Sequence, residues 1–96
     1  MYKIIYSNRA DNNINDAKIF YENRKEGLGQ EFYEELTKRI KNQIAKHPKF
    51  AKNIYKNIRQ VSLNRFPYKI RYTINEKEKQ VQIIAVTHDK RKPEYN

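Results

Sequence analysis

The strongest constraint on the fold is a run of strict two-residue alternation between residues 66 and 74. Its apolar positions are Phe66, Tyr68, Ile70, Tyr72 and Ile74, and the polar positions between them include Lys69 and Arg71. Successive side chains of a strand point to opposite faces, so the run predicts a strand with one core face. Its other face would hold two cations on a rigid element, where an anionic partner could bind. The simpler interpretation is that both cations are the solvated side of a half-buried strand.

Two amphipathic helices are predicted before this strand, after a short strand over residues 2–6. The first begins at a cap on Ser7 or Asn8 and ends near Lys25, with apolar residues at i, i+4, i+7 and i+11. The second has an apolar residue at every fourth position from Leu28 to Ile44 and ends at His47. Glycines at 27 and 29 supply the turn between them, so the helices form a hairpin whose apolar stripe must lie on a sheet.

Two further strands are expected, over residues 54–63 and 79–88. A turn at residues 64–65 would place Val61 opposite Tyr68 and Arg59 opposite Ile70. The apolar run at residues 83–86 suggests that the last strand is buried inside the sheet. The chain therefore predicts one α+β domain over residues 1–96.

Composition excludes several classes of protein. Cysteine is absent and only two histidines are present, so a disulfide framework is impossible and a structural zinc site is disfavoured. No phosphate loop, dinucleotide fingerprint or nucleophile elbow occurs, so we expect no cofactor. The N-terminus lacks an apolar signal core and the longest aliphatic run is far shorter than a membrane span, so we expect a cytosolic protein without membrane contact.

The positive charge is concentrated in the second half of the chain. Residues 1–48 hold nine Lys or Arg and seven Asp or Glu, whereas residues 49–96 hold twelve and four. This asymmetry favours nucleic acid or an acidic protein segment as partner over a neutral metabolite. A proteome generally rich in lysine is the alternative explanation, although it would raise the lysine content of both halves.

The basic half also contains a set of side chains that could act on phosphate: Lys69, Arg71, His88, Arg91 and Tyr95. Such a set can bind phosphate and, in principle, cleave RNA without a metal, because cations stabilise the charged transition state while another group moves protons. Only His88 among them ordinarily titrates near neutral pH. A single histidine after a buried strand is more often a packed residue, so both interpretations stay open.

Several motifs together resemble the RelE/ParE family of toxins from bacterial type II toxin–antitoxin modules, which includes plasmid stabilisation proteins. They are Gly27-Leu28-Gly29-x-x-Phe32, Arg59, Phe66-Pro67-Tyr68-x-Ile70-x-Tyr72 and Ala85-Val86-x-His88-x-x-Arg91-x-Pro93. The resemblance implies a β-α-α-β-β-β order, with the helical hairpin packed on one face of an antiparallel sheet. It also implies a cognate antitoxin as partner. The cellular target would be DNA gyrase or ribosome-bound mRNA.

The resemblance carries over to individual positions. The arginine of nuclease-type members falls on Lys69 and their C-terminal tyrosine on Tyr95, whereas two of their lysines fall on Gln60 and Ser62. Losing those two charges favours a toxin that inhibits growth by binding a replication target such as gyrase. The alternative is a metal-free mRNA endoribonuclease with Lys69, His88, Arg91 and Tyr95 as catalytic residues. Further binding candidates are Arg59, Arg65 and Arg71, with a structural role as the alternative for Arg59.

Overall fold

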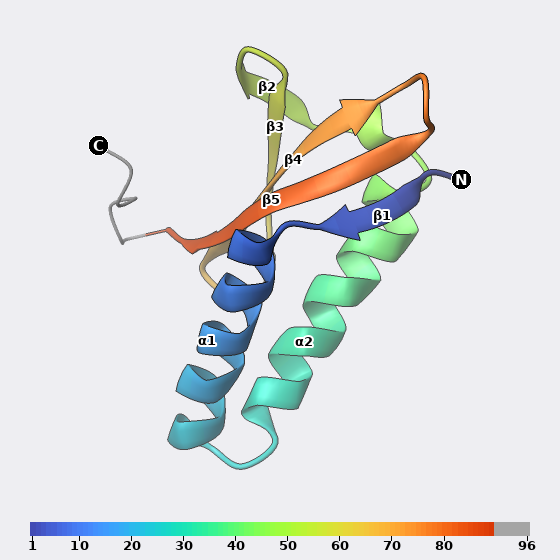
Figure 1. The fold of residues 1–96 in the computed structure, drawn as a ribbon. Helices are drawn as coiled ribbons and strands as arrows, with labels where there is room; N and C mark the ends of the chain where they lie inside the picture. The colour runs from blue at the N-terminus through green and yellow to red at the C-terminus, as the bar shows by residue number, and fades with distance from the viewer. Residues whose placement is uncertain (90–96) are drawn as a thin grey trace.

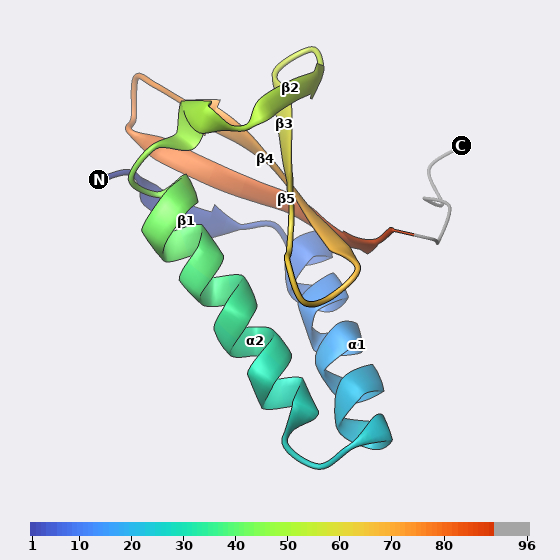
Figure 2. The same cartoon turned by 180° about the vertical axis from the view of Figure 1, so that it is seen from behind.

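The computed structural model describes residues 1–89, in which two helices lie on one face of a five-stranded sheet (Figures 1 and 2). The strands are β1 (Lys3–Tyr6), β2 (Lys52–Tyr55), β3 (Ile58–Ser62), β4 (Tyr68–Asn75) and β5 (Gln80–His88). The helices are α1 (Asn8–Arg24) and α2 (Leu28–Arg39), followed by a π-helical turn, η1 (Ile40–Ile44), and a 3-10 turn, η2 (Pro48–Phe50). The α+β class and the helical hairpin on one face of the sheet are as predicted.

The helical hairpin begins and turns where the sequence indicates. Ser7 caps α1, because its hydroxyl accepts a hydrogen bond from the main-chain N–H of Ala10 at 3.0 Å. Gly27 adopts φ 86° at the start of α2, a left-handed conformation that favours glycine. At Gly29 the helices cross closely, since a Cβ there would lie 2.5 Å from the carbonyl oxygen of Lys18. The Glu22 carboxylate accepts hydrogen bonds from both glycine N–H groups, which ties the turn to α1.

The π-helical turn explains how the second helix keeps its apolar series on the core side. In a regular α-helix, residues four apart drift by about 40°, so the series from Leu28 to Ile44 would rotate by roughly 160°. At η1 the N–H of Ala45 bonds to the carbonyl of Ile40, five residues earlier, at 2.8 Å. This wider turn brings Ile44 back towards the core. As a result, Phe32, Leu36, Ile40 and Ile44 are each at most 1% exposed.

The sheet differs from the prediction in three ways. It is mixed, because β1 pairs in parallel with β5, while its order is β1-β5-β4-β3-β2. The strand predicted over residues 54–63 is instead a hairpin of β2 and β3, in which Lys56 takes the left-handed turn at φ 48°. The predicted register between β3 and β4 is wrong by two residues, since Val61 pairs with Ile70 and Arg59 with Tyr72. A shift of two leaves every side chain on its predicted face.

The core is an aromatic cluster between the hairpin and the sheet. The Phe32 ring lies 5.5, 5.3 and 5.1 Å from the ring centres of Tyr21, Phe66 and Tyr68. The predicted core side of β4 is buried at Tyr68, Ile70 and Tyr72 and half-buried at its end. Because the core side of β4 is packed against the helices, the side chains on its opposite side are held at fixed positions.

Candidate functional site

We call the uncovered side of the sheet the open face (Figures 1 and 2). Because Tyr68, Ile70 and Tyr72 point to the helices, the alternating residues of β4 point to the open face. Cross-strand pairing arranges the side chains of the open face in rows that run across the strands. One row is Lys52, Gln60, Arg71 and Ala85, and the next is Ser62, Lys69 and Thr87.

The open face is positively charged because its strands contain no carboxylate. None of the five strands, as bounded above, contains Asp or Glu. Lys69 and Arg71 are half-buried at their centre, and Arg71 Nε donates a hydrogen bond of 2.8 Å to Gln60 Oε1 on β3. Gln60 therefore orients the Arg71 guanidinium. According to the motif resemblance, nuclease-type members carry a lysine at the position of Gln60.

His88 is on the opposite side of the sheet from Lys69. It pairs with Tyr68, and the two rings meet edge to face with centres 5.2 Å apart. The reason is a β-bulge in β5: Arg71 pairs with Ala85 but Tyr72 pairs with Ile83, so one extra residue reverses the alternation. The bulge also accounts for the apolar run at residues 83–86, because Ile83 and Val86 both face the core despite being three residues apart.

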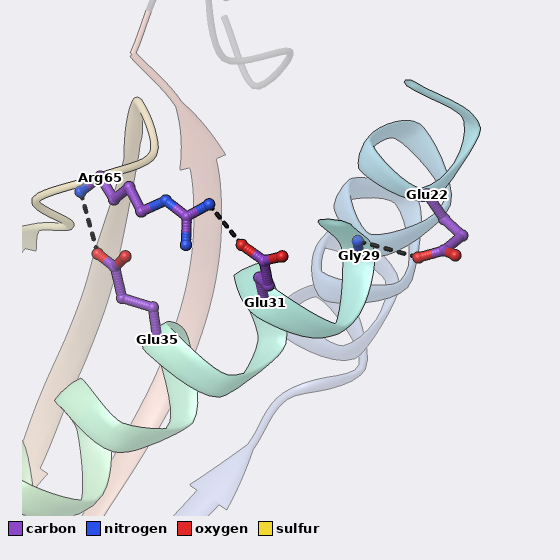
Figure 3. Close-up of polar contacts among 5 residues, drawn as sticks. All are labelled: Glu22, Gly29, Glu31, Glu35 and Arg65. Atoms are coloured by element: carbon purple, nitrogen blue, oxygen red, sulfur yellow. Dashed lines mark hydrogen bonds and ion pairs between the residues drawn. The ribbon is translucent and has the colours of Figure 1, made fainter. Parts of the chain in front are cut away.

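The other predicted site residues are divided between the described and the undescribed parts of the chain. Arg91 and Tyr95 lie outside the described residues. Arg65 is held on α2: its guanidinium pairs with Glu31, while its main-chain N–H donates to Glu35 at 3.1 Å (Figure 3). The β3–β4 turn is thereby attached to the helical layer, and Arg65 lies apart from the open-face row of Lys69.

Arg59 points to the helix side of the sheet, as its pairing with Tyr72 requires. Its Nη1 donates hydrogen bonds to the carbonyl oxygens of Ala51 at 2.7 Å and Lys49 at 3.2 Å. Next to it, the hydroxyl of the fully buried Tyr72 donates to the carbonyl oxygen of Pro48 at 2.6 Å. These bonds fasten the η2 turn to β3 and β4, an arrangement that matches the structural alternative for Arg59.

Burial of Tyr72 predicts a loss of stability at alkaline pH. Desolvation raises the pKa of its hydroxyl to about 12, although the Arg59 charge opposes this. The neutral phenol is favoured in the folded state, so its contribution is complete below the ordinary pKa of about 10 and is lost as pH rises towards 12. We expect the unfolding free energy to fall more steeply between pH 10 and 12 in the wild type than in Tyr72→Phe, as measured by urea titration. Parallel pH curves would contradict this.

A shallow hollow of about 470 Å³ lies at the other end of the sheet from Lys69. Amide and hydroxyl groups dominate its lining, which includes Asn57, Thr73, Asn75, Gln80 and Gln82. Sequence reasoning missed this hollow, because it forms only when β4 pairs with β5 and the β2–β3 turn brings Asn57 beside them. Among residues 1–89 no cluster of His, Cys, Asp or Glu could hold a metal ion, and none of their helices is long and apolar enough to span a membrane.

The family model of the ParE toxin of the type II toxin–antitoxin system parDE matches residues 4–93. The chain belongs to this toxin family. It is thus a type II toxin of the RelE/ParE kind, as the motifs predicted. No curated protein sequence matches the toxin.

Solved structures show the same fold. The chromosomal ParDE system from P. aeruginosa contains a chain that is 14% identical, with a TM-score of 0.75 over 92% of this toxin and 96% of that chain. The intact E. coli RelBE toxin–antitoxin complex contains a chain that is 20% identical, with a TM-score of 0.72 over 95% of this toxin and 100% of that chain. The isolated E. coli RelE toxin is 19% identical, with a TM-score of 0.70 over 99% of this toxin and 92% of that chain. At these identities the likeness concerns the fold.

Proposed function

We propose that this toxin inhibits growth in the cytoplasm by binding a replication target such as DNA gyrase through its open face. The observation that carries the proposal is the arrangement on β3 and β4, where Lys69 and Arg71 stand beside Gln60 and Ser62. Within residues 1–89 the strands place no histidine or carboxylate on this face, so an acid–base cleavage of RNA there would depend on a lysine or a tyrosine to move protons. Fixed cations on a rigid sheet suit electrostatic binding.

A cognate antitoxin is the second partner that we propose. Membership in a toxin family of type II systems supports it, as do the structural relatives, which come from the ParDE and RelBE systems. With a net charge of +10, the toxin favours an antitoxin whose binding segment is acidic. The complex would then weaken as ionic strength rises, because the screening length shortens.

The test compares the two targets directly with purified full-length toxin. We expect inhibition of gyrase supercoiling at toxin concentrations that leave mRNA intact in a reconstituted translation reaction. Replacing His88 with Gln should preserve growth inhibition, whereas a nuclease that used His88 for proton transfer would slow on the order of a hundredfold. Cleavage of mRNA with unaffected gyrase would contradict the proposal and support the RelE-like alternative.

A further inference from the structure

The end of the second helix carries a concentration of cations. Residues 36–46 contain Lys38, Arg39, Lys41 and Lys46 and no Asp or Glu. They span the last turn of α2 and the π-helical turn η1. Because the helix dipole favours cations at this end, their number alone does not indicate a ligand. The contacts of Arg39 distinguish this helix end from an ordinary one.

Arg39 makes no hydrogen bond or ion pair within residues 1–89, and its Nε is buried. A spacing of four residues along a helix normally allows a pair such as Glu35 and Arg39 to interact. Glu35 Oε2 instead accepts hydrogen bonds from the main-chain N–H groups of Asn64 and Arg65, both at 3.1 Å (Figure 3). A buried donor without an acceptor is rare and costs free energy. A ligand that accepts from Arg39 therefore gains a bond that these residues do not make themselves.

Arg39 also lines a small hollow between the end of α2, η1 and the β3–β4 turn. Its volume is about 310 Å³, and its lining residues are Glu35, Lys38, Arg39, Asn42, Gln43 and Asn64. Glu35 and Arg39 are half-buried, whereas the other four are exposed. The lining offers a guanidinium, an ammonium and three side-chain amides as donors. The volume is at the lower end of the range for ligand pockets, about 300 to 1,000 Å³, so it suits a small group.

The charge of the lining selects the class of ligand. Two cations, Lys38 and Arg39, and one carboxylate, Glu35, leave one excess positive charge. A carboxylate ligand neutralises this charge. A phosphate group, which carries about −1.5 to −2 at pH 7, would leave excess negative charge beside Glu35. A carboxylate also matches a guanidinium in shape, because two parallel N–H groups bind its two oxygens.

We propose that this hollow is a carboxylate-binding site. Since no bond holds the Arg39 side chain within the described residues, its rotation brings Nε and one Nη to the same carboxylate, and Lys38 supplies the second positive charge. The ligand is a small free carboxylate or an Asp or Glu side chain of a protein, which present the same group. The site lies on the helix side of the sheet, opposite the open face, so its absence would leave the gyrase proposal standing.

Nuclear magnetic resonance of the ¹⁵N-labelled full-length toxin at pH 7 tests the proposal, with acetate replacing chloride at constant ionic strength. We expect a saturable shift of the Arg39 Nε–Hε signal and none for Arg65, whose guanidinium pairs with Glu31. Arg39→Gln should weaken acetate binding about 10- to 150-fold, as followed at the Asn42 and Asn64 side-chain amides. Arg39→Lys should weaken it less, because the charge remains without the fork. Inorganic phosphate should bind more weakly than acetate.

Arg24→Gln is the matched control. Arg24 is in the last turn of α1, as Arg39 is in that of α2, but its guanidinium lies 4.8 Å from the centre of the Phe20 ring. It should leave acetate binding unchanged. A shift that does not saturate, equal losses in Arg24→Gln and Arg39→Gln, or tighter binding of phosphate than of acetate would overturn the proposal.

The peptide acetyl-Gly-Glu-Gly-amide separates the two sources of the carboxylate. Binding tighter than that of acetate, and lost in acetyl-Gly-Gln-Gly-amide, would support the site and identify the ligand as a protein side chain, because the peptide then adds contacts of its own. Peptide binding equal to or weaker than that of acetate would support the site for a small free carboxylate. Binding of neither acetate nor the Glu peptide would overturn the proposal.

Discussion

Replacing Phe32 with alanine is expected to remove about 3 to 5 kcal/mol from the unfolding free energy. The Phe32 side chain is fully buried and touches the rings of Tyr21, Phe66 and Tyr68. Its removal takes away the α2 ring from the contacts between the helical hairpin and the sheet and leaves a cavity that the neighbouring rigid rings cannot fill. Since a domain of this size has a stability of about 5 to 15 kcal/mol, this loss is a large share of the total.

Urea unfolding followed by circular dichroism measures this loss. Tyr33→Ala, at the next position of α2, is the control, because its side chain is 37% exposed and contacts the Lys18 ammonium instead of the aromatic cluster. We expect it to change the unfolding free energy by less than about 1 kcal/mol. A similar small loss at Phe32 would show that the aromatic cluster does not hold the two layers together.

The elements that the sequence predicted well are those fixed by local periodicity. Alternation over residues 66–74 located β4, the four-residue spacing located α2 and its continuation, and the two candidate caps Ser7 and Asn8 marked the start of α1. Each signal depends on the neighbouring residues alone. The predicted core side of β4 followed as well, because alternation assigns faces without knowledge of the partner strand.

The errors concern contacts between distant segments. The β2–β3 turn at Lys56 and Asn57 carries no glycine or proline that would have marked a turn. In addition, β2 is exposed on both faces, so it shows no apolar alternation that would have marked a separate strand. The register of β3 and β4 depends on a turn held by Glu35 of α2, which lies about thirty residues earlier in the chain. The parallel pairing of β1 with β5 joins opposite ends of the described chain. Local patterns do not contain this information.

The candidate site was predictable in part for the same reason. Alternation placed Lys69 and Arg71 on the polar side of β4, where the structure also has them. The side on which His88 lies depends on the bulge in β5, and a bulge is visible only once the neighbouring strand is aligned. If residues 83–88 alternated regularly without the bulge, His88 would share the open face with Lys69. The bulge thus separates a potential proton-transfer group from the cations.

Removing both open-face cations of β4, as Lys69→Gln with Arg71→Gln, is expected to abolish growth inhibition while the protein stays folded. The proposed target is bound electrostatically, and these two side chains are the central charges of a face whose strands carry no carboxylate. Stability should change by less than about 1 kcal/mol, because neither cation is buried in the core. Gln60 retains a hydrogen-bonding neighbour when Arg71 becomes glutamine, so the strand pair loses little.

Colony counts after induced expression measure toxicity, and urea unfolding of the purified variant verifies the fold. The matched control removes two cations elsewhere, as Lys77→Gln with Lys79→Gln in the exposed β4–β5 turn, so that net charge falls equally. If loss of overall charge alone weakened the toxin, both double variants would lose toxicity to the same degree. Loss confined to the first pair locates the target-binding surface on the open face, because of the two pairs only Lys69 and Arg71 stand on a packed strand. Full toxicity of the Lys69/Arg71 variant would place target binding on another surface.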